Sequence, residues 1–114
     1  MIIGGTHTDF LAAALRGLDA QRQAYEHNVA NVETPHFRAQ RVNFEDSLRR
    51  AIQLDDPRSM GLRVSRSTDA TRPDGNNVRL DKELTAIEEN ALRQQLMTAA
   101  LNHTYGRIRA ALGR

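Results

Sequence analysis

The sequence contains neither cysteine nor tryptophan, and its two tyrosines and three phenylalanines make up only 4% of its 114 residues. Without cysteine, the chain has no disulfides and no thiolate metal sites. Its length allows one small domain and excludes a two-lobed enzyme. With 39% hydrophobic residues and few aromatics, the chain has little material for a compact core. We therefore expect partner chains to supply part of the burial.

Long apolar runs and blocks of one charge are missing as well. No run approaches the roughly 18 apolar residues of a membrane span, so we expect no direct membrane insertion. Residues 1–17 have no basic region and no small-residue cleavage site, so we expect no cleaved signal peptide. The 16 basic and 14 acidic residues give a net charge of +2. This small charge argues against nucleic acid as a partner.

Patterns that carry catalysis are also scarce. The four histidines are scattered without the spacing of metal ligands. Gly4 and Gly5 lack the Lys-Ser/Thr that follows in a phosphate-binding loop. The carboxylates of Glu88 and Glu89 are adjacent in sequence and point in different directions on a helix. The sequence therefore predicts no catalytic residue, no cofactor and no metal, and a protein that is not an enzyme.

Helical periodicity starts near Asp9 and predicts a helix over about 9–33. Pro35 ends it, because proline disfavours helical geometry in the preceding residue, Thr34. The apolar positions recur at a mean interval of about 3.5 residues, as in a coiled-coil seam. They are Leu11, Leu15, Leu18, Tyr25 and Val29.

A second and more regular stripe predicts a helix over about 80–112, with Asp81 as its N-cap. Its apolar members are Leu84, Ile87, Ala91, Leu101, Tyr105, Ile108 and Leu112. We expect the two terminal helices to pack as an antiparallel, coiled-coil-like hairpin. Because one hairpin cannot cover both stripes, we also expect self-association into a helical tube.

Between these helices, an extended segment and a short helix are predicted over about 36–54, with Asn43 as N-cap. Residues 55–77 form a polar loop with room for a short strand or hairpin, ending in a tight turn at Gly75. Substitutions in 59–72 should be tolerated. The expected fold is mainly α, in a single domain 1–114.

One stretch is not explained by helix packing alone. An ordinary helix stop accounts for Thr34 and Pro35, but not for Asn28 and Asn31 in the last turn, since asparagine favours caps and turns over helix interiors. Asparagine amides both donate and accept hydrogen bonds. The pair can therefore bind the exposed carbonyls of the helix end or a neighbouring chain.

This stretch resembles the bacterial flagellar rod and hook family, whose members carry Asn-hydrophobic-Ala-Asn-x-x-Thr-Pro-Gly-Tyr at the end of an N-terminal helix. The matching residues are Asn28, Ala30, Asn31, Thr34, Pro35, Phe37 and Arg38, continued by Phe44 and Leu48. His36 stands where the family usually has glycine, and Phe37 where it usually has tyrosine. The resemblance is closest to proximal rod members and covers roughly 10–54 and 74–112.

The resemblance implies a structural subunit of the basal-body rod, which spans the periplasm and transmits torque to the distal rod and hook. It also implies export by the flagellar type III apparatus without signal cleavage. The implied partners are further copies of the chain, the rod proteins FlgC and FlgF, FliE and the MS ring of FliF. On this view the apolar stripes pack within and between subunits, and the motif fixes the turn after the first helix.

Two alternatives stay open. One is another rod protein of the same family, similar to FlgC. The other is a small helical DNA-binding protein, since Arg107, Arg109 and Arg114 gather at the end of the second helix. A salt-dependent affinity for DNA would distinguish the latter.

Overall fold

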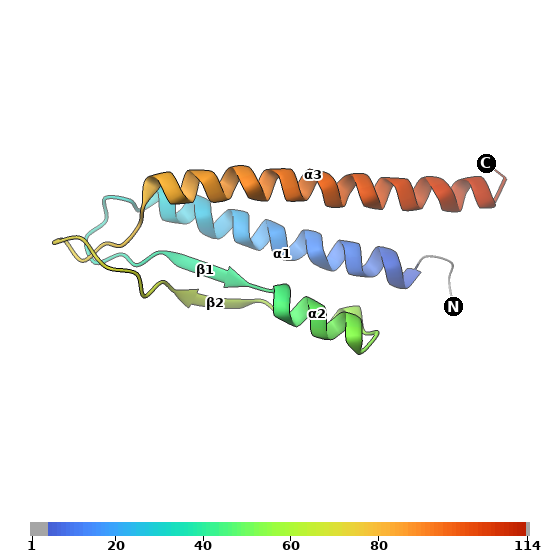
Figure 1. Ribbon diagram of the computed structural model, residues 1–114, viewed down its shortest axis with the longest axis horizontal. Helices are drawn as coiled ribbons and strands as arrows, with labels where there is room; N and C mark the ends of the chain where they lie inside the picture. The colour runs from blue at the N-terminus through green and yellow to red at the C-terminus, as the bar shows by residue number, and fades with distance from the viewer. Residues whose placement is uncertain (1–4, 114) are drawn as a thin grey trace.

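The protein is elongated, and its computed structural model describes residues 5–113, with extents of 63 × 26 × 14 Å (Figure 1). In chain order the elements are helix α1 (Gly5–Ala30), strand β1 (Gln40–Asn43), helix α2 (Glu45–Gln53), the 3-10 turn η1 (Pro57–Ser59), strand β2 (Arg63–Arg66) and helix α3 (Leu80–Ala111). The predicted domain 1–114 and the basic cluster that includes Arg114 extend beyond the described residues. None of the helices within 5–113 is long and apolar enough to cross a membrane.

Helices α1 and α3 lie side by side and run in opposite directions (Figure 1). Asn28 near the end of α1 bonds Glu83 near the start of α3, and Asn90 further along α3 bonds the carbonyl of Leu18. This arrangement confirms the predicted mainly α fold with an antiparallel helical hairpin. Helix α3 is the longer of the two and continues past the start of α1 (Figure 1).

The buried and half-buried side of α3 matches the predicted apolar stripe only at every second position. The residues of that side are Glu83, Ile87, Asn90, Gln94, Met97, Leu101, Thr104 and Ile108, at alternating steps of 4 and 3. Ile87, Leu101 and Ile108 belong to both sets, whereas Leu84 and Tyr105 are 47% and 48% exposed. The apolar pattern alone could not reveal this register, because Glu83 and Asn90 are polar residues that are buried by hydrogen bonding.

Helix α1 is covered on two sides, by α3 and by the layer of β1 and α2. Its buried residues are Thr8, Ala13, Ala14, Gly17, Leu18, Gln21, Ala24 and Asn28. The Phe44 ring, itself 3% exposed, lies so close to Gly17 that an added β-carbon would come within 2.3 Å of it. The close approach of neighbouring elements to α1 therefore requires small side chains on this helix. Of the apolar stripe predicted for α1, only Leu18 is buried.

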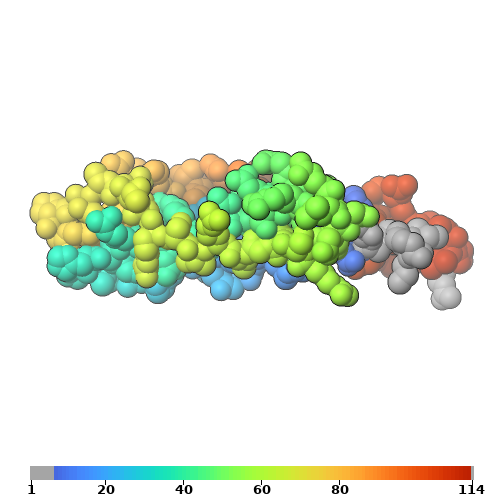
Figure 2. Space-filling view, turned by 90° about the horizontal axis from the view of Figure 1, so that it is seen from below, coloured from blue at the N-terminus to red at the C-terminus, as the bar shows by residue number. Residues whose placement is uncertain are grey.

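The two strands form an antiparallel sheet in which Val42 faces Val64 and Gln40 faces Arg66. Strand β1 lies against α1, and β2 lies on the side away from the helices (Figure 1). The sheet confirms the short strand expected inside the polar loop. In Figure 2, seen from below, the yellow-green chain around β2 runs along the face toward the viewer.

The element ends differ from the predicted ones. Helix α1 spans Gly5–Ala30 and gives way to turns before Glu33. Asn43 ends β1, and the residue before α2 is Phe44, without a side-chain cap. Helix α3 ends at Ala111. Its hydrogen bonding starts at the Arg79 carbonyl, so Asp81 lies in the first turn and accepts from the Lys82 N–H instead of capping.

Candidate functional site

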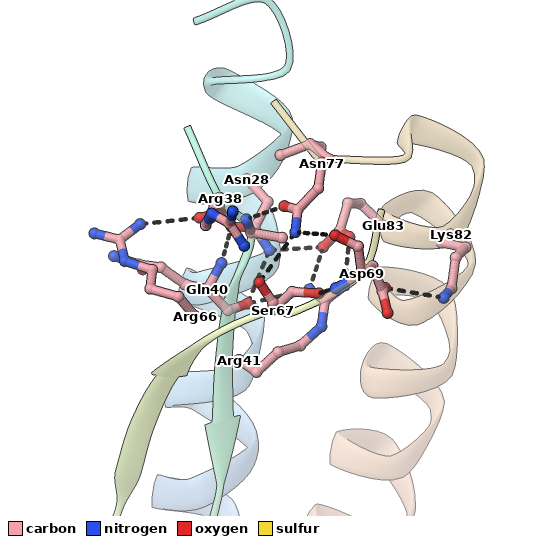
Figure 3. Close-up of polar contacts among 12 residues, drawn as sticks. Asn28, Arg38, Gln40, Arg41, Arg66, Ser67, Asp69, Asn77, Lys82 and Glu83 are labelled. Carbon is pink, nitrogen blue, oxygen red and sulfur yellow. Dashed lines mark hydrogen bonds and ion pairs between the residues drawn. The ribbon is translucent and has the colours of Figure 1, made fainter. Parts of the chain in front are cut away.

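The end of α1 is tied to the sheet and to α3 by one buried side chain, Asn28, which is fully buried. Its Oδ1 accepts from the backbone N–H of Gln40 at 2.7 Å, and its Nδ2 donates to the Gln40 carbonyl at 3.0 Å (Figure 3). The same Nδ2 donates to Oε1 of Glu83 at 2.7 Å. Asn28 thus behaves toward β1 as a neighbouring strand would, while also holding α3.

Glu83 is the largest of the fully buried side chains, with 1% exposure. Its two carboxylate oxygens accept one hydrogen bond each from the guanidinium of Arg41, both at 3.2 Å (Figure 3). A buried carboxylate is costly unless it is paired and hydrogen-bonded. Arg41 and Asn28 meet that condition together, so β1, α1 and α3 are joined at one point.

Asn77 closes the space between the two chain segments that lead into the strands. Its Oδ1 accepts from the Ala39 N–H at 2.7 Å, and its Nδ2 donates to the carbonyls of Ser67 at 3.0 Å and Asp69 at 3.2 Å. The Ser67 N–H in turn donates to the Ala39 carbonyl at 2.7 Å. An amide side chain therefore takes the place of a ladder hydrogen bond just beyond the sheet.

Asn76 caps the last carbonyls of the α1 segment. Its Nδ2 donates to the carbonyls of Asn31 at 2.9 Å and Thr34 at 2.8 Å. The Arg72 guanidinium adds hydrogen bonds to the carbonyls of Val32 and Val78. Helix ends leave carbonyls without intrahelical partners, and here residues from a distant segment satisfy them. We call Asn28, Arg41, Asn76, Asn77 and Glu83 the asparagine junction.

The turn after α1 depends on two left-handed residues. His36 has φ +62°, and its N–H donates to the Asp74 carbonyl at 2.9 Å. Gly75 has φ +83°, and a β-carbon there would approach Nδ1 of His36 to 2.5 Å. His36 occupies the position where the resemblance leads us to expect glycine. The backbone geometry explains that preference, because glycine adopts positive φ without strain.

The other motif residues lie around this turn. Asn31 donates to the His27 carbonyl at 2.9 Å and accepts from the Thr34 hydroxyl at 3.0 Å. Phe37 packs edge-on against the His27 ring, and the Arg66 guanidinium lies over its face. The motif residues that remain exposed are Ala30, Thr34, Pro35 and Arg38, whereas Phe44 is buried and Leu48 half-buried.

The stripe residues fall into three groups. Leu18 is buried, and the half-buried members are Leu11, Leu15, Tyr25, Val29, Ile87, Leu101 and Ile108. The exposed members are Leu84, Ala91, Tyr105 and Leu112. Three further leucines of α3, Leu80, Leu92 and Leu96, are exposed too. Helix α3 therefore shows apolar side chains on more than one side of the α1 contact.

Sequence reasoning missed most of the asparagine junction. Asn76 and Asn77 directly follow the glycine of the predicted tight turn, and Glu83 falls in the helix predicted over about 80–112, but none of the three was predicted to be buried. The available signal was the polar spacing of Glu83, Asn90 and Gln94 around Ile87, which follows steps of 4 and 3 as a buried stripe does. Long-range hydrogen bonding of these side chains decides their burial, and no local pattern reveals it.

The buried polar side chains of the described residues are satisfied by hydrogen bonds and ion pairs. Burial raises the pKa of the Tyr25 hydroxyl, and the hydrogen bonds that the Arg22 guanidinium donates to Asp19 and to Glu26 raise the pKa of that guanidinium. Within residues 5–113, every buried side-chain nitrogen or oxygen has a hydrogen-bond partner, and no group of three His, Asp or Glu residues is placed to hold a metal ion. Fully satisfied polar networks of this kind rigidify a structure.

No protein-family model matches the chain. Curated proteins similar to it include the flagellar basal body rod protein FlgB of Bacillus subtilis, which is 25% identical over 115 residues, covering 90% of this chain and 89% of the relative. The FlgB of Borreliella burgdorferi is 25% identical, covering 91% and 93%. The FlgB of Escherichia coli K12 is 30% identical over 122 residues, covering 82% of this chain and 88% of the relative.

Proposed function

Because the chain belongs to the FlgB family of flagellar basal body rod proteins, we propose that it is a structural subunit of the proximal rod that transmits torque from the MS ring toward the distal rod and hook. The observation that carries this proposal is the similarity to FlgB proteins along most of the chain, at up to 30% identity. The helical hairpin and its saturated asparagine junction suit a load-bearing part, since packed networks resist deformation. In this role the chain performs no catalysis.

The unpartnered leucines of α3 support the assembly part of the proposal. Leu92 and Leu96 are 59% and 57% exposed, and side chains four residues apart lie on one side of a helix. Leu84 and Tyr105 are exposed next to the α1 contact. Apolar side chains gathered on a helix in this way favour burial against further subunits. We propose that copies of the chain and other rod proteins cover them.

The proposed neighbours are FlgC and FlgF among rod proteins, and FliE and FliF on the side of the MS ring. The proposed location is the rod where it spans the periplasm, reached by type III export without signal cleavage. The motif residues of the turn would hold the chain where it leaves the inner helices. Strand β2 would then lie away from those helices, as in Figure 1, whereas Asn76 and Asn77 hold the end of the same segment against α1.

The test is Leu96→Asp, introduced into the gene in the bacterium that carries it. In the free protein Leu96 is exposed, so its stability should change by no more than about 0.5 kcal/mol. In an assembly the new charge would lie in a desolvated contact without a partner, which is strongly unfavourable. We therefore expect loss of swimming with a normal amount of the exported subunit in the periplasm.

Gln95→Asp is the matched control, because Gln95 is the exposed neighbour of Leu96 and gains the same charge. Cells with Gln95→Asp should swim normally. Normal swimming of the Leu96→Asp strain would contradict a subunit contact at this side of α3. Normal swimming after deletion of the whole gene would contradict the rod function itself.

A further inference from the structure

The two edges of the small sheet differ in how their backbone groups are used. On the α1 side, the Gln40 N–H and carbonyl are both bonded to Asn28, and the Val42 carbonyl accepts from Nε2 of Gln21 at 3.1 Å. Side chains of α1 thus close the outer edge of β1. Among the described residues the outer edge of β2 has no equivalent cover, and in Figure 1 β2 lies on the side of β1 away from α3.

The register identifies which groups of β2 are free. Gln40 turns its backbone groups toward α1, so Gln40 and its ladder partner Arg66 form a non-hydrogen-bonded pair. In such a pair, the N–H and carbonyl of Arg66 also point away from the other strand. The side-chain period of two puts Val64 in the same position. Within residues 5–113, no hydrogen bond to these outward groups is present.

The charge around this edge is uneven. Arg50 and Arg63 line a cavity of about 290 Å³ together with Asn43 and Ser47. No carboxylate of the described residues pairs with Arg50 or Arg63, whereas Asp46 at the same cavity pairs with Arg49 at 2.9 Å. Between residues 38 and 79 the chain has nine arginines and six acidic residues. Arg63 at the start of β2 and Arg50 of α2 therefore meet at this cavity, at the α2 end of the sheet, without carboxylate partners among the described residues.

We propose that the outer edge of β2 binds an extended, acidic segment of another protein, which adds a third strand to the sheet. The backbone groups of Val64 and Arg66 would supply the main-chain hydrogen bonds, as in strand addition generally. Arg50 and Arg63 would pair with the acidic side chains of the added strand. Val64, which is 63% exposed, would pack against its apolar side chains.

A second copy of this chain fits the same edge poorly. Pairing two β2 strands would bring Arg63 and Arg66 of both copies into one four-stranded patch, and like charges across strands are destabilising. Short length and charged side chains are also common features that keep an edge strand from pairing with the same strand of another copy. An acidic partner turns the same charges into attraction. This inference is independent of the proposed rod function.

The test uses the full chain and NMR amide signals, with the acidic peptide acetyl-Thr-Glu-Val-Glu-Val-Glu-amide as probe. We expect the amides of Val64 and Arg66 to shift and to gain protection from hydrogen exchange, with smaller changes at Ser65. The same peptide with lysine in place of glutamate should bind at least about tenfold more weakly. Raising the salt from about 0.05 M to about 0.5 M should also weaken the binding.

Val64→Pro removes the outward N–H and leaves the ladder bonds to β1 in place, so it should weaken peptide binding about tenfold or more. Val64→Thr is the matched control, because it keeps the N–H and a β-branched side chain. Unchanged amide signals of Ala39 and Gln40 report an intact junction in both variants. Arg63→Gln should weaken binding of the acidic peptide several-fold and should not weaken that of the lysine peptide.

Three results would overturn the proposal. The first is equal binding of the acidic and lysine peptides. The second is a response of α3 amides without one at Val64 and Arg66. The third is a shift of the Val64 and Arg66 amides with protein concentration alone, which would assign the edge to a second copy of the chain.

Discussion

Single asparagine side chains do in this protein what whole strands do in a larger sheet. Asn28 pairs with both backbone groups of Gln40, and Asn77 bridges the segments at Ala39 and Ser67. A primary amide offers donor and acceptor side by side, which matches the two backbone groups of one residue. These side chains therefore let a two-stranded sheet, too small to be stable alone, hold its place on α1.

The first prediction at this scale concerns Asn28→Ala. The change leaves the Gln40 N–H and carbonyl and the buried Glu83 without one partner each. The free energy of unfolding should therefore fall by about 2–4 kcal/mol. Asn31→Ala is the matched control in the same helix end, because Asn31 bonds one carbonyl and one hydroxyl at the surface. Its cost should be below about 1 kcal/mol. Urea denaturation measures both, and equal losses would contradict the central role of Asn28.

The second prediction concerns the turn at His36. At φ +62° a residue with a β-carbon is strained, so His36→Gly should stabilise the protein by up to about 1 kcal/mol after the entropy cost of glycine. His36→Ala keeps a β-carbon and should bring no gain. Thermal unfolding of the two variants distinguishes them. A destabilised His36→Gly variant would show that the imidazole contributes contacts that outweigh the backbone strain.

At the scale of elements, the two long helices use different packing surfaces. Helix α1 is approached closely from two sides and carries small residues there, such as Ala13 and Gly17. Helix α3 uses a mixed polar and apolar stripe toward α1 and exposes leucines elsewhere. The polar loop also differs from expectation, because Ser67 is buried and Arg72 holds two carbonyls. Substitutions of Ser67 or Arg72 should therefore be tolerated less well than substitutions elsewhere in 59–72.

The third prediction compares two glycines in helices. Alanine usually stabilises a helix relative to glycine by about 0.5–1 kcal/mol. Gly106→Ala should follow this rule, since a β-carbon there meets nothing within 4 Å. Gly17→Ala should instead destabilise by about 1–3 kcal/mol through overpacking against Phe44. Urea denaturation measures the free energy of unfolding of both variants. Adding Phe44→Leu should restore part of the stability that Gly17→Ala loses. Stabilisation by Gly17→Ala would contradict the close packing of Phe44 on α1.

At the scale of the whole molecule, the chain is long, thin and only partly covered by itself. Helix α3 runs past the start of α1 (Figure 1), so its last turns extend beyond the described part of α1. Isolated helices owe most of their stability to packing. The asparagine junction gathers many of the long-range hydrogen bonds at the other end of the hairpin. The molecule is therefore best secured where α1 ends and α3 begins.

The fourth prediction follows from this uneven coverage. Circular dichroism and light scattering over a wide concentration range should show helical signal rising together with particle mass, because association covers the exposed side chains of α3. A salt-dependent affinity for DNA should not accompany it. A fully helical small oligomer at the lowest concentrations would instead indicate an autonomous domain and reopen the DNA-binding alternative.

The sequence by itself determined the element order, because helical periodicity, Pro35 and the turn at Gly75 are local signals. It also determined the family, through a run of residues that includes Asn28, Thr34 and Pro35. Only the tertiary structure decided which side of α3 meets α1 and how the sheet is held. Those features depend on Glu83, Asn76 and Asn77, whose partners lie more than 30 residues away in most cases. Long-range hydrogen bonds bury such polar side chains, and apolar spacing along the chain carries no signal for them.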